Sequence, residues 1–169
     1  MKRNVTTLQQ ALVFLLQGLV YTENKLKQDL QPGCLALVSL PIAEEMNNYS
    51  NASVNKLLKL HRVFNYLLCE PTPRKNEIVD SILIETNIMI DSAKTSFVRD
   101  IVAIGHLQQI NAFKMAAYRT AYMLACELEL DVAADLLQQI LEWENEVNHR
   151  LQALAFNEIY KPHSSTLIP

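Results

Sequence analysis

The stretch from Asp131 to Asn157, DVAADLLQQILEWENEVNHRLQALAFN, decides the fold of this chain. Its large apolar residues recur at steps of three and four positions, which places them on one face of a helix: Leu137, Ile140, Leu141, Val147, Leu151 and Leu154. Glu144 lies in the middle of that apolar face. A carboxylate buried there costs several kcal/mol unless a partner pairs with it, so the stretch predicts a polar site inside the fold.

A second stretch near the start of the chain repeats this pattern. Glu23 interrupts an apolar row that runs from Leu8 to about Leu30: Leu8, Leu12, Leu15, Leu19, Leu26 and Leu30. Thr6 or Thr7 is placed to cap this helix, with Gln9 or Gln10 in position for a capping box. Two carboxylates, each centred in the apolar row of a long helix, predict one shared polar site inside a helical bundle.

The periodicity predicts three further helices between these two. A second long helix starts near Pro41; its firm part is 54–69, because the weak helix formers of 47–53 are expected to loosen or break it. A shorter helix is expected over 76–93. A third long helix follows to about Leu128, and Asp131 is expected to cap the last one.

Four long helices with a short helix in the long middle connection predict an all-α fold, a ferritin-like four-helix bundle with a short crossover helix. The bundle is expected to form a single domain over residues 1–158, with residues 159–169 as a C-terminal tail. In bundles of this kind, metals are held by glutamates and by Glu-x-x-His pairs that project inward.

Charge and composition exclude several classes of function. The 15 basic and 18 acidic residues give a net charge of −3 with no basic patch, so neither nucleic acid nor membrane is an expected partner. The chain has no GxxxxGK loop, GxSxG elbow, HExxH or CxxC pair. Its three cysteines, Cys34, Cys69 and Cys126, are expected to be free thiols in a reducing compartment, which indicates a cytoplasmic protein.

Several stretches carry a resemblance to a known family. They are VRDIVAIGHLQQ (98–109), AAYRTAYMLACELELDVAADLLQQILEWE (116–144), RLQALA (150–155) and, in the first helix, YTENKL (21–26). The chain resembles the bacterial YciE/YciF-type ferritin-like family, which is associated with stress responses. The resemblance covers most of the chain except 31–53. It implies a carboxylate site for two iron or manganese ions in a protein that is usually dimeric.

The resemblance assigns ligand positions residue by residue. Two family glutamates fall on Glu23 and Glu144. The Glu-His-x-Glu of the third long helix falls on Asn111, Ala112, Phe113 and Lys114, another polar position falls on Asn148, and a carboxylate of the second helix falls near Asn55. The di-metal centre is therefore expected to be degenerate. Lys114 is predicted to pair with Glu23, Glu144 or both, in the electrostatic place of the metal.

Two readings of these residues stay open at this point. Glu23 and Glu144 are either metal ligands or a structurally paired set of buried carboxylates. His61, on the apolar second helix, is either an extra ligand or a satisfied core imidazole.

The sequence predicts a structural or interaction protein that is a non-catalytic homodimer with no bound cofactor. It names no particular protein partner and favours a protein that is not an enzyme. The alternative is a di-iron or di-manganese oxidase or iron-handling protein with a reduced ligand set.

Overall fold

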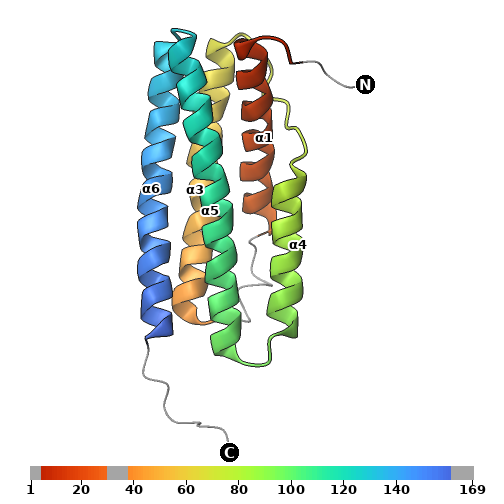
Figure 1. The fold of residues 1–169 in the computed structure, drawn as a ribbon, viewed down its shortest axis with the longest axis vertical. Helices are drawn as coiled ribbons and strands as arrows, with labels where there is room; N and C mark the ends of the chain where they lie inside the picture. Colours follow the sequence, from red (N-terminus) through yellow and green to blue (C-terminus); the bar gives the residue numbers. More distant parts are fainter. Residues whose placement is uncertain (1–4, 30–37, 161–169) are drawn as a thin grey trace, which may run out of the picture.

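The computed structural model describes residues 5–29 and 38–160, and in this part of the chain five helices and no strand are present (Figure 1). The helices are α1 (Leu8–Asp29), α3 (Leu40–Tyr66), α4 (Glu77–Ser92), α5 (Ser96–Glu127) and α6 (Asp131–Ile159). The all-α prediction is confirmed, and the architecture is the expected ferritin-like helical bundle.

The four long helices α1, α3, α5 and α6 run side by side, and the shorter α4 lies outside them (Figure 1). The most extensive contact is between α5 and α6, whereas α3 packs mainly on α1 and α6, and α4 packs mainly on α5. The link after α3 crosses from one end of the bundle toward its middle before α4 begins (Figure 1). α4 is therefore the predicted crossover helix.

Each long helix buries one row of residues with alternating steps of four and three, the spacing of coiled-coil cores. In α6 this row is Ala133, Leu137, Ile140, Glu144, Val147 and Leu151. The apolar members form two separate clusters along the bundle. The upper core includes Leu16, Leu19, Phe64, Leu137 and Ile140. The lower core includes Leu26, Met46, Tyr49, Ile104, Val147 and Leu151. Glu23 and Glu144 lie on the rows between the two cores.

Side chains cap three of the helix starts, and Thr7 confirms the cap expected for the first helix. The Thr7 hydroxyl accepts from the Gln10 amide at 3.2 Å, and the Asn76 and Thr95 side chains accept from the amides two and three residues on. Asp131 was expected to cap α6 and does not, because α6 begins at Asp131 itself and Leu130 occupies the cap without a side-chain hydrogen bond.

The expected break in the second helix is wrong, since α3 is continuous from Leu40 to Tyr66. Its middle holds three residues that face the bundle interior: Tyr49, Ser50 and Ser53. Burial of this face outweighs the weak helix propensity of the asparagines and serines around it.

Arg74 connects the link between α3 and α4 to α1 through hydrogen bonds and a ring contact. Its amide donates to the Gln17 carbonyl at 3.0 Å, its Nε donates to the Phe14 carbonyl at 3.3 Å, and its guanidinium lies 3.7 Å from the centre of the Phe14 ring. Gly18 makes room for this contact, because a Cβ there would lie 2.8 Å from Arg74 Nη2.

Cys69 and Cys126 are free thiols, and Cys34 lies outside the described residues. Within the described ranges, no helix combines the length and the apolar character that a membrane crossing requires.

Candidate functional site

Glu23 of α1 and Glu144 of α6 converge at the centre of the bundle, where both side chains are 0% exposed. Lys114 of α5 lies between them. Its Nζ is 2.9 Å from Glu23 Oε1 and 2.8 Å from Glu144 Oε1. The prediction that Lys114 pairs with Glu23, Glu144 or both is confirmed, and it pairs with both.

A second lysine, Lys56 of α3, balances the second buried carboxylate charge. Its Nζ lies 2.7 Å from Glu144 Oε1, and its side chain is also 0% exposed. Two ammonium groups and two carboxylates thus share one buried space, contributed by all four long helices. Their formal charges cancel.

Neutral side chains bind the remaining sites on the carboxylates. The Tyr118 hydroxyl donates to Glu23 Oε1 at 2.8 Å, and the Ser53 hydroxyl donates to Glu23 Oε2 at 2.7 Å. Asn111 Nδ2 donates to Glu144 Oε2 at 2.8 Å. Every carboxylate oxygen therefore has a partner, which is the condition under which buried charges are tolerated.

Tyr49 closes the lower side of this ion cluster, which we define as Glu23, Lys56, Lys114 and Glu144. The ring centre lies 4.6 Å from Lys114 Nζ and 5.3 Å from Lys56 Nζ, within the range of cation–π attraction. The ring belongs to the lower core, so it joins the polar layer to the apolar packing beneath it.

The environment shifts the pKa values of these groups in opposite directions. Burial alone raises the pKa of Glu23, but the Lys114 and Lys56 charges and the hydrogen bonds outweigh it, so the pKa is lowered. Burial lowers the pKa of Lys114, yet the two carboxylates outweigh burial and raise it well above its usual value. Burial and the charge of Lys114 together lower the pKa of Lys56. Lys56 is thus the ammonium that gives up its proton more readily.

The structure brings together four of the residues singled out in the sequence: Glu23, Asn111, Lys114 and Glu144. Two others lie elsewhere. His61 is exposed, so its expected place on a buried face is wrong; the buried row of α3 passes through Leu60 and Val63 and leaves His61 facing solvent. Asn148 is half-buried, and its side chain is not among those that contact the two carboxylates.

Lys56 was not predicted from the sequence, and neither were the contacts of Ser53 and Tyr118 with Glu23. The second-helix position was placed near Asn55, which is exposed, whereas its neighbour Lys56 points inward. The signal was present as a row with alternating steps of four and three, along which Lys56 falls: Ile42, Met46, Tyr49, Ser53, Lys56, Leu60 and Val63.

The cluster does not fit a di-metal centre. Iron and manganese sites of this type need several carboxylates or imidazoles, and an ammonium group has no lone pair to offer a metal. Within residues 5–29 and 38–160, no three His, Cys, Asp or Glu side chains come together in a way that could hold a metal ion. The two lysines instead bind the oxygens that a metal would need.

Comparison with known proteins agrees with this fold. Residues 7–162 match the family model described as a domain of unknown function, DUF892. The chain belongs to this family. Together with the relatives that follow, this match confirms the resemblance to the YciF-type family.

Individual relatives show the same relationship. Protein YciF of Escherichia coli (strain K12) is 32% identical over 83 residues, which are 49% of this chain and 50% of that protein. The chain thus spans about half the length of the curated relative it matches. The crystal structure of the E. coli stress protein YciF superposes with a TM-score of 0.87 at 23% identity, covering 93% of this chain and 99% of that one. YcfI from Rhodopseudomonas palustris gives a TM-score of 0.84 at 20% identity, covering 90% and 97%.

The Lys114→Met substitution should lower the free energy of unfolding at pH 7 by roughly 3–5 kcal/mol, because it leaves Glu23 buried without the ammonium it contacts. Urea denaturation would measure this loss. Lys25→Met is the matched control, since Lys25 pairs with Asp29 at 2.7 Å on the surface and such a pair is worth about 0.3–0.5 kcal/mol. Equal losses in the two variants would mean that Lys114 carries no buried charge pair.

The cluster should also make stability depend on pH on the acid side. The pKa of Glu23 is lower in the folded chain than its ordinary value of 4.5, so the unfolded state binds more protons below that pH. The stability that Glu23 contributes is present above about pH 4.5 and is lost as the pH falls through its folded pKa. Glu23→Gln should therefore be less stable than the parent at pH 7 and approach it at acid pH.

Denaturant titrations of the parent and of Glu23→Gln between neutral and acid pH would measure this difference in the free energy of unfolding. Glu44→Gln changes an exposed glutamate of α3. Its free energy of unfolding should differ from that of the parent by an amount that does not depend on pH. A constant difference between Glu23→Gln and the parent at all pH values would contradict the assignment of Glu23 as a charged cluster member.

Proposed function

We propose that this chain is a non-catalytic structural or interaction protein whose di-metal centre has been replaced by the ion cluster. The observation that carries the proposal is that Lys114 lies 2.9 Å from Glu23 and 2.8 Å from Glu144, while Lys56 lies 2.7 Å from Glu144. The interior is already neutral and its oxygens are already bound. An incoming metal ion would have to displace two buried ammonium groups.

The relatives are compatible with this role. YciF of E. coli is described as a stress protein, and YcfI is described provisionally as a structural protein. We extend both descriptions to this chain as a stress-related role in the bacterial cytoplasm. The competing function, an oxidase or iron-handling protein, would have to bind iron or manganese with Glu23 and Glu144 as its carboxylates.

We further propose that the protein is a symmetric homodimer. The outer face of α3 leaves three large apolar side chains in solvent: Val54 (40% exposed), Leu58 (60%) and Tyr66 (47%). A two-fold interface pairs the same patch on both copies, and covering such a patch lowers its free energy in water. The α3 faces of two copies would then pack on each other.

Metal analysis tests the loss of the di-metal centre. Protein produced in medium replete with iron and manganese should contain far less than one metal ion per chain. Replacing Lys56, Asn111 and Lys114 together by Glu should raise the metal content and make stability depend on metal, because it surrounds the same space with carboxylates. Two ions per chain in the parent protein would contradict the proposal and support the oxidase or iron-handling alternative.

Light scattering at micromolar concentration tests the dimer. The parent chain should have the mass of two copies, and the double substitution Val54→Ser with Leu58→Ser should shift it toward one copy. Ile84→Ser with Ile88→Ser, on the exposed face of α4, should leave the mass unchanged. A monomeric parent protein would refute the dimer.

A further inference from the structure

The outer face of α4 is apolar although it faces solvent. Ile78, Ile84 and Ile88 are 58%, 61% and 61% exposed, while the opposite face of the same helix packs on the lower core through Val79, Leu83 and Ile90. A helix with large apolar residues on both faces is typical of one that is covered on both sides. Among the described residues, the inner face packs on the bundle, and α4 lies outside the four long helices (Figure 1).

Charge shows what could cover the outer face. α4 carries four acidic residues, Glu77, Asp80, Glu85 and Asp91, and no basic one. Lys75, in the preceding link, lies 4.0 Å from Glu77 and 3.7 Å from Asp80. Among the described residues, Glu85 and Asp91 take part in no ion pair. The isoleucines are thus bordered by uncompensated negative charge.

This charge pattern argues against two possible partners for the face, a second copy of the chain and a membrane. Pairing α4 with α4 of a second copy would bring together four carboxylates from each helix, of which Lys75 contacts only two, and like charges at an interface are unfavourable. An anionic membrane surface would be repelled for the same reason. A basic apolar surface satisfies both the isoleucines and the carboxylates.

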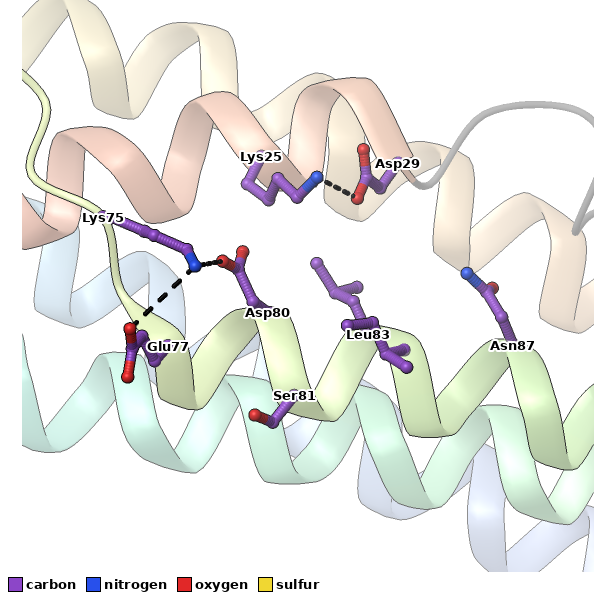
Figure 2. A pocket seen from close by; sticks show the side chains of 9 residues that line it. Lys25, Asp29, Lys75, Glu77, Asp80, Ser81, Leu83 and Asn87 are labelled. Carbon is purple, nitrogen blue, oxygen red and sulfur yellow. Dashed lines mark ion pairs between the residues drawn. The ribbon is translucent and has the colours of Figure 1, made fainter.

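A cleft adjoins the exposed isoleucines of α4. It has a volume of about 380 Å³ and lies between α1 and α4. Figure 2 shows Lys25 and Asp29 on its α1 side and Asp80, Leu83 and Asn87 on its α4 side. Ile84 lines the cleft and also belongs to the exposed face, so the two surfaces are continuous.

We propose that this face of α4, with the adjoining cleft, docks a basic amphipathic helix of another protein. Apolar side chains of the partner would cover Ile78, Ile84 and Ile88, and its lysines or arginines would lie along Glu77 and Glu85. This mode of recognition is the helix-in-groove type. The proposal rests on the interaction role proposed above and names the surface that serves it.

The test uses the full chain and labelled helical peptides of about 18 residues, roughly five turns. One peptide has leucines at steps of three and four bordered by lysines; a second has the same leucines bordered by glutamates; a third is the lysine peptide scrambled. Fluorescence anisotropy should show binding of the lysine peptide alone. Ile84→Ser with Ile88→Ser should weaken it at least about tenfold.

Val54→Ser with Leu58→Ser is the matched control, because it removes a similar exposed apolar pair from α3 and should not change the peptide affinity. Glu77→Lys with Glu85→Lys should reverse the preference toward the glutamate peptide. The proposal is overturned if all three peptides bind alike, or if the α3 and α4 variants lose affinity equally. It is also overturned if Ile84→Ser with Ile88→Ser dissociates a dimer, since a second copy is then the occupant. Metal content is measured separately, so failure here leaves the test of the metal-free interior intact.

Discussion

The neutral cluster of Glu23, Lys56, Lys114 and Glu144 is the constraint on which the rest of the bundle depends. A buried ion pair adds little net stability compared with an apolar pair of similar size, but removing one member leaves a charge that the interior cannot solvate. Each long helix supplies one member. If any helix slides by one heptad, its charged residue enters an apolar core while its partners lose a counter-charge. The cluster therefore fixes the axial register of all four helices at once.

This constraint explains why the apolar interior is divided. The upper and lower cores each have the spacing of an ordinary coiled-coil core, and apolar residues alone would allow several registers. The ion cluster between the two cores allows only one register of the four helices. Tyr49 and Tyr118 connect the ion cluster to the two cores: the Tyr118 hydroxyl binds Glu23 and its ring packs in the upper core, whereas the Tyr49 ring packs below the ammonium groups. Polar matching and apolar packing thus select the same arrangement.

The fold could be predicted from sequence because apolar periodicity is a property of each helix alone. Glu23 and Glu144 could also be predicted, since each interrupts a visibly apolar row. Lys114 was indicated by the family resemblance, which places it at a ligand position. Lys56 lies on an equally regular row, but that row holds Tyr49 and Ser53, and the apolar residues around it, Val54, Leu57 and Leu58, suggest a different face. A polar residue on a core row looks like a surface residue until its partner on another helix is known. The same ambiguity misplaced His61.

The proposed replacement of metal by lysine would have a consequence for where function can lie. Metal ions in a bundle of this kind supply both charge balance and chemistry, whereas ammonium groups supply only the charge balance. With Lys56 and Lys114 against the carboxylates, the ion cluster fixes the register and its carboxylate oxygens are already bound. What remains available for recognition is the surface. There, α4 combines exposed isoleucines with four carboxylates and no base, an arrangement that the packing of the bundle does not require. A feature without a role in the fold is where an interaction protein would carry its specificity.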